Sequence, residues 1–159
     1  QYTAYLAGEL SRNTANAVDI CGSAVFAEDE VFYLDGYETQ LCNLLSGEMK
    51  RISLVLDGRA AAIQLKCAPR LSVRLPESPE EPPVIRVRAA VRCDEADAGK
   101  YVEALRQDVA SLLIKCQQWG ADPVGFCERA RMRVWTLMDW EALDWPELYR
   151  KAVFEIDIR

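Results

Sequence analysis

The sequence predicts an α+β domain, in which an antiparallel or mixed β-sheet carries one long helix and two or three shorter helices on one face. Three observations lead to this class. Short alternating apolar runs recur through residues 22–93, a long apolar stripe with helical period follows at 101–116, and an alternating strand ends the chain at 152–158. At 159 residues the chain is long enough for one domain, which we expect at 18–159 behind a linker or stub at 1–17.

The first elements are two short strands and a helix. CGSAVF and VFYL flank an acidic turn at residues 27–30. Asp35-Gly36 is compatible with a hairpin turn, but Asp35-x-x-Glu38 is also a capping-box pattern. Leucines at 41, 44 and 45 recur at helical spacing, which favours a helix from about 36 to 46, capped by Asp35 and ended by Gly47.

Four runs of strand character follow. Apolar and polar residues alternate at 52–56, 63–67, 71–75 and 84–93, with a turn at Asp57-Gly58. The run 76–83, PESPEEPP, is expected to form an exposed loop because its prolines cannot donate to a ladder. Together the four runs predict an antiparallel sheet with one solvated face.

The helical half begins after the last of these strands. A stripe from Tyr101 to Cys116 predicts a helix over about 95–118. Asp122-Pro123 predicts the start of a second helix. We expect its apolar stripe to contain Phe126, Cys127, Ala130, Val134, Leu137 and Met138. Asp144-x-x-Glu147 opens a short helix before the final strand.

The amino-acid composition argues against several classes of activity. Histidine is absent, which removes the usual general base and most zinc sites, so we expect neither an enzyme nor a cofactor. The net charge of −6 disfavours nucleic-acid binding. No run is apolar and long enough to span a membrane, and no signal peptide opens the chain.

The six cysteines are expected to be free thiols rather than disulfides or metal ligands, since no C-x-x-C pair occurs. Four of them fall on the apolar face of an expected element, where a thiol packs as a small hydrophobe. These four are Cys67, Cys93, Cys116 and Cys127.

Three groups of residues have both a functional and a structural interpretation. The functional interpretation of the tryptophans is a partner surface, and the structural interpretation is packing within the fold. These residues are Trp119, Trp135, Trp140 and Trp145. Lys66, Arg74, Arg86, Arg88 and Arg92 suggest an RNA platform, but no aromatic residue interleaves with them, and a solvated sheet face is favoured. Glu28, Asp29, Glu30 and Asp35 lack the spacing of a calcium loop and are expected at a hairpin tip.

Residues at both ends of the domain carry a family resemblance. The chain resembles the C-terminal domain of the Ger(x)C family, the C-subunit lipoproteins of GerA-type nutrient germinant receptors in bacterial spores. The matching stretches are GSAVFAEDEVFYLDGYETQLCNLLSGEMKRISLVL (22–56), QQWGADPVGF (117–126) and DWPELYRKAVFEIDI (144–158).

This resemblance implies a non-catalytic scaffolding or binding domain with helices against a sheet. It also implies attachment to the extracytoplasmic face of the inner spore membrane through an N-terminal lipid anchor outside this chain, and partnership with the A- and B-type receptor subunits. The alternative is a small-molecule-sensing domain of an extracytoplasmic lipoprotein, which an apolar pocket with converging polar groups would favour.

Overall fold

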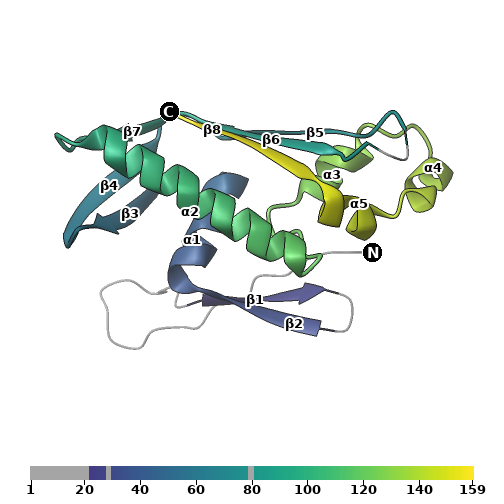
Figure 1. The fold of residues 1–159 in the computed structure, drawn as a ribbon, viewed down its shortest axis with the longest axis horizontal. Coiled ribbons are helices and arrows are strands. Elements are labelled where there is room, and N and C mark those ends of the chain that lie inside the picture. Colours follow the sequence, from purple (N-terminus) through teal and green to yellow (C-terminus); the bar gives the residue numbers. More distant parts are fainter. Residues whose placement is uncertain (1–21, 28–29, 79–80) are drawn as a thin grey trace.

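A long helix runs through the middle of the molecule, with strands on both sides of it (Figure 1). This computed structural model describes residues 22–27, 30–78 and 81–159. The helices are α1 (Gly36–Ser46), α2 (Ala98–Gln118), α3 (Phe126–Arg131), α4 (Leu137–Ala142) and α5 (Trp145–Lys151). The strands are β1 (Gly22–Ala27), β2 (Glu30–Asp35), β3 (Arg51–Leu56), β4 (Arg59–Leu65), β5 (Arg70–Arg74), β6 (Val84–Ala89), β7 (Val91–Cys93) and β8 (Val153–Ile158). The α+β class is confirmed.

The strands divide into three sheets rather than one. β1 and β2 form an antiparallel hairpin, β3-β4-β7 form a second sheet, and β5-β6-β8 form a third in which β6 and β8 are parallel. The run 84–93, expected as a single strand, changes partners at Ala90. Before it β6 pairs with β5 and β8, whereas after it β7 pairs with β4.

The start of α1 has the expected capping box. The Asp35 carboxylate accepts from the Glu38 amide at 2.8 Å, and the Glu38 carboxylate accepts from the Asp35 amide at 3.0 Å. Gly47 closes the helix at φ +85°, a left-handed conformation that glycine adopts without steric cost. The competing hairpin interpretation of Asp35-Gly36 is therefore excluded.

Helix α2 supplies much of the core. It begins at Ala98, three residues later than the expected start at 95. Its expected stripe is buried except for Val102, which is partly buried. The buried members are Tyr101, Leu105, Val109, Leu112, Leu113 and Cys116. The helix lies against strands of two sheets, β3 and β7 of one and β8 of another.

The second helix was predicted with the wrong start, and two residues of its predicted stripe, Leu137 and Met138, are exposed rather than buried. Asp122 does not cap it; α3 begins at Phe126 behind Gly125, which has φ +80°. The Asp122 carboxylate instead accepts from the amides of Gly125 at 3.0 Å and Cys127 at 2.6 Å, so it holds the turn that precedes the helix. At the other end α3 stops at Arg131, and a new helix starts after Thr136, whose hydroxyl accepts from the Asp139 amide.

The cysteines of the described residues are all free thiols, as expected. Cys42 and Cys116 are buried, and Cys93 and Cys127 are partly buried. Cys67 is exposed, which corrects its expected place on the core face. It lies two residues beyond Leu65, the last residue of β4, where the strand alternation no longer applies. Cys21, the linker or stub expected at 1–17 and the acidic pair 28–29 lie outside the described residues.

Candidate contact surface at the tip between α3 and α4

The four tryptophans do not form one surface. Trp119, at the end of α2, stacks on Phe32 of β2 with ring centroids 4.7 Å apart and an angle of 12° between the ring planes. The ammonium of Lys115 lies 5.0 Å from the centre of the Trp119 ring. Trp119 is thus a packing residue that joins the β1-β2 hairpin to α2.

Trp145 belongs to the core. It is only 4% exposed and lies 6.0 Å from the ring of Tyr149. Trp140 of α4 stacks on its outer side at 6.2 Å and is partly buried. The structure therefore brings Trp140 and Trp145 together, with Trp140 as the partly exposed member of the pair.

Trp135 is 99% exposed and stands between α3 and α4. Three other large apolar side chains of the same segment are also exposed: Met132 at 77%, Leu137 at 60% and Met138 at 80%. We call these four residues the α3–α4 tip. Figure 1 shows α4 at one end of the molecule, away from the central helix. Four exposed large apolar side chains within residues 132–138 are more than the scattered single ones normal for a protein surface, and such a concentration is typical of an interaction site.

The backbone of the tip is hydrogen-bonded although its side chains are not packed. The Arg133 amide donates to the Ala130 carbonyl at 2.9 Å, and the Val134 amide donates to the Arg131 carbonyl at 3.1 Å. The Thr136 hydroxyl lies 2.6 Å from the Asp139 carboxylate. The apolar side chains are consequently displayed from ordered turns, which lowers the entropy cost of binding.

Sequence reasoning named Trp135 but missed its three neighbours in the tip. Leu137 and Met138 were placed on a buried stripe because they continue the helical spacing of α3. The pattern Thr136-x-x-Asp139 was the available contrary signal, since a Thr cap starts a new helix and resets the face that each residue occupies.

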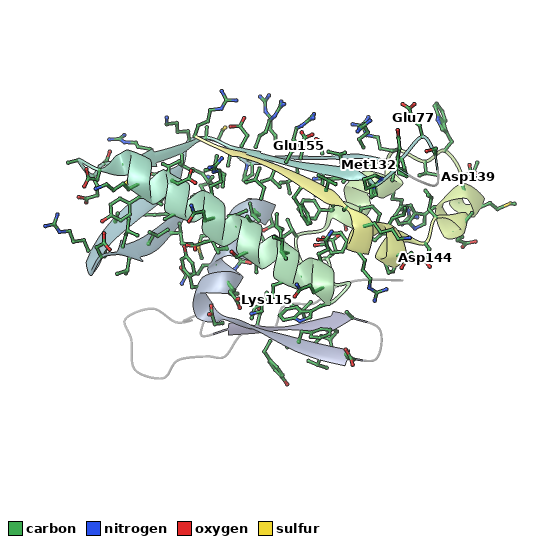
Figure 2. All side chains as sticks on the ribbon, in the orientation of Figure 1. Glu77, Lys115, Met132, Asp139, Asp144 and Glu155 are labelled. Carbon is green, nitrogen blue, oxygen red and sulfur yellow. The ribbon has the colours of Figure 1, made fainter. Side chains whose placement is uncertain are left out.

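A groove of about 1040 Å³ lies beside the tip. It runs between α3, α4 and α5, and the stacked Trp140 and Trp145 form part of its wall. Figure 2 labels Asp139 and Asp144 in this part of the molecule, before and after the end of α4. Charged residues of both signs line the groove: Glu48, Asp122, Glu128, Arg129, Arg131, Glu141 and Asp144. The groove is therefore not the predominantly apolar cavity typical of small-molecule sites.

The thiol of Cys127 and the carboxyl group of Asp122 lie beside the groove, and neither is arranged as a reactive group. Burial raises the pKa of the Cys127 thiol to about 12, and the nearby Asp122 carboxylate adds to the shift. Burial also raises the pKa of Asp122, while hydrogen bonds from the Phe126, Cys127 and Gly125 amides oppose that shift. A thiol with a raised pKa is a poor nucleophile. In the described part of the chain, no group of acidic or thiol side chains is arranged to hold a metal ion.

Comparison with known proteins adds a likeness of fold. No protein-family model matches the sequence, and no curated protein matches it. The structure is similar to that described as the crystal structure of the GerBC protein, with a TM-score of 0.69 and 18% sequence identity. The alignment covers 99% of this chain and 55% of that chain, so this chain spans about half the length of the GerBC structure. This likeness shows a Ger(x)C-like fold. Among the described residues, no helix is long and apolar enough to cross a membrane.

Proposed function

We propose that this chain is a germinant-receptor-related domain that acts by contact and performs no chemistry. The GerBC-like fold over 99% of the chain is the observation that carries the proposal. The residues that resemble the Ger(x)C family, at 22–56, 117–126 and 144–158, point to the same proposal. In this role the domain is a rigid block that positions partner proteins.

The contact surface in this proposal is the α3–α4 tip, with the partly exposed Trp140 beside it. Trp135 is nearly fully exposed, and tryptophan is enriched among the residues that dominate binding energy at interfaces. Met132 and Met138 add flexible side chains that adapt to a partner's surface. Trp119 and Trp145 are engaged in packing and are not part of the surface we propose.

The partners in this proposal are the A- and B-type receptor subunits. The full-length protein would be held at the extracytoplasmic face of the membrane by a lipid on an N-terminal cysteine outside this chain. Both statements come from the family resemblance. They fit a domain whose interaction surface is a small apolar tip, because an upstream anchor raises the local concentration of partners and a weak contact is then sufficient.

Co-purification of the full-length protein with the two receptor subunits tests the proposal. Trp135→Ala should lower the recovered A and B subunits about tenfold or more, because loss of a hot-spot residue costs about 2 kcal/mol. Val55→Ala is a matched control, since Val55 is also an exposed large hydrophobe but lies on β3. Wild-type recovery of both subunits with Trp135→Ala would contradict the contact assignment.

A ligand-sensing role is the second candidate, and an unpartnered polar atom of a groove-lining residue is the observation that favours it. Trp145 lines the groove, and its buried Nε1 has no hydrogen-bond partner among the residues that the structure describes. A small molecule that raises the thermal midpoint of the wild type but not of Trp140→Ala would favour sensing over scaffolding.

A further inference from the structure

The outer face of the β5-β6-β8 sheet carries a cluster of arginines. The strand pairing aligns its outward residues in three rows across the sheet. These rows are Arg70–Arg88–Asp157, Ser72–Arg86–Glu155 and Arg74–Val84–Val153. We call Arg70, Arg74, Arg86 and Arg88 the arginine face. Figure 1 shows the helices of the described residues below this sheet, with none above it.

The two acids of the sheet are already engaged. Arg86 Nε lies 2.5 Å from Glu155 Oε2, and Arg159 lies 2.5 Å from Asp157. Figure 2 labels Glu155 along this outer edge of the molecule. Among the described residues, no carboxylate lies within ion-pair distance of the other three arginines of the face, which are Arg70, Arg74 and Arg88.

Arg70 and Arg88 are directly opposite each other on neighbouring antiparallel strands. Like charges in that position repel and destabilise a sheet. Both residues are exposed, so neither is needed for the core. The repulsion is relieved when an anionic group lies between or above the two guanidinium groups, which are suited to bidentate contact with phosphate or carboxylate. The face thus carries four arginines against two carboxylates, Glu155 and Asp157, which leaves it with a net positive charge on a chain of net charge −6.

The composition of the face selects among anionic partners. The core of a protein–protein interface is depleted of charge and rich in apolar and aromatic residues. Here the charged residues occupy the centre, and the outward valines Val84 and Val153 lie at one end of the face. The aligned rows contain no aromatic side chain on which the bases of a single strand could stack. A flat, hydrated array of phosphates fits best, since arginines on neighbouring strands are about 5 Å apart in their backbone positions.

We propose that the arginine face binds the headgroups of anionic phospholipids and orients the domain with β5, β6 and β8 toward a bilayer surface. The binding is electrostatic: the phosphates meet Arg70, Arg74 and Arg88, while Arg86 keeps its pair with Glu155. The α3–α4 tip is left for a protein partner. This contact does not rest on the proposed receptor role, because vesicles test it without any receptor subunit.

Sedimentation of the purified chain with vesicles tests this contact. Vesicles of phosphatidylcholine are compared with vesicles containing about 30% phosphatidylglycerol, a mixture with a negative surface potential. The double variant R70Q/R88Q removes the facing pair. The matched control R51Q/R59Q removes the same charge from exposed positions on β3 and β4. Thermal denaturation of both variants ensures that folded proteins are compared.

The wild type is expected to bind the anionic vesicles but not pure phosphatidylcholine. Each arginine near such a surface contributes about fivefold to binding, so R70Q/R88Q should lower the partition coefficient about 25-fold. Raising the salt from about 0.1 M to 1 M should abolish the binding, because the Debye length falls from about 10 Å to 3 Å. R51Q/R59Q should bind as the wild type does.

Three results would overturn the proposal. They are absence of wild-type binding to anionic vesicles, equal loss of binding in both double variants, and competition for the face by an acidic peptide or duplex DNA in preference to vesicles. The third result would assign the arginine face to a different class of partner. A lipid contact confirmed here would stand even if the receptor subunits did not co-purify.

Discussion

The Nζ of Lys115 lies 2.6 Å from Oε1 of Glu38, across 77 residues of sequence. The same Glu38 carboxylate accepts the Asp35 amide through Oε2 and so completes the cap of α1. Lys115 also lies over the ring of Trp119. One carboxylate therefore fixes the start of α1 and attaches it to the end of α2.

Removal of the Glu38 carboxylate is expected to destabilise the fold. Glu38→Ala should lower the free energy of unfolding by about 2 kcal/mol, because it removes half of a capping box and one side of a partly buried ion pair. Urea denaturation measures the change. Glu103→Ala is the matched control: it removes the exposed Glu103–Arg106 pair within α2, and its effect should be clearly smaller.

A double-mutant cycle separates the two roles of Glu38. Lys115→Met removes the ion pair but leaves the cap, so the coupling energy between positions 38 and 115 reports the ion pair alone. A coupling energy near zero would show that Glu38 acts only through the cap of α1.

Gly22 is expected to tolerate no side chain. A Cβ at this position would lie 2.8 Å from the backbone carbonyl oxygen of Leu34, and the paired strand cannot move without disturbing the hairpin. Gly22→Ala should therefore destabilise the domain by about 1–3 kcal/mol. Gly99→Ala is the opposite case, because its Cβ would meet no atom within 4 Å in the first turn of α2. It should be neutral or stabilise by up to about 1 kcal/mol. Thermal denaturation of both variants tests this difference between the two glycines. Equal destabilisation by the two substitutions would contradict it.

Local signals in the sequence were sufficient for most elements of the fold. The caps at Asp35 and Asp144 have the geometry that their spacing predicts, because each side chain accepts from an amide three residues later. The turn at Asp57-Gly58 is also as expected, with both residues at positive φ between paired strands. These features depend on residues that are close in sequence, and a single sequence contains that information.

Features that depend on distant residues could not be predicted. The run 84–93 alternates without interruption, yet it divides at Ala90 because Val91 donates to the carbonyl of Arg159 and Lys66 donates to the carbonyl of Ala90. The candidate site was missed for a different, local reason, because the Thr136 cap that starts a new helix was overlooked. Exposure of Trp135 depends on where α3 ends and α4 begins, which local spacing placed incorrectly.

The thiols provide a pH-dependent prediction. Burial raises the pKa of Cys42 from its ordinary 9.0 to about 12, with the Glu38 carboxylate as a smaller cause. Above pH 9.0 the unfolded chain loses this proton while the folded chain keeps it, so the unfolded state binds fewer protons. This contribution to stability is complete below pH 9.0 and is lost as the pH rises through 12. The urea midpoint should therefore decrease as the pH rises from 9.0 toward 12.

Substitution of individual cysteines assigns that slope. Cys42→Ala should flatten the decline of the urea midpoint, because it removes the buried thiol. In a Cys21→Ser background, Cys67 should also be the thiol that reacts fastest with an aromatic disulfide reagent. Rapid reaction that persists after Cys67→Ser would contradict the burial assigned to the other thiols.

Truncation of two tryptophans ten residues apart should change the free energy of unfolding by very different amounts. Trp145→Ala removes a ring that is 4% exposed and lies between the rings of Trp140 and Tyr149, so it should cost about 3–5 kcal/mol of unfolding free energy. Trp135→Ala removes a ring that is 99% exposed, so its cost should be within about 0.5 kcal/mol of zero. Urea denaturation followed by circular dichroism compares the two. A large loss of stability with Trp135→Ala would mean that the ring packs against the domain in solution, and the α3–α4 tip would then lose its main contact residue.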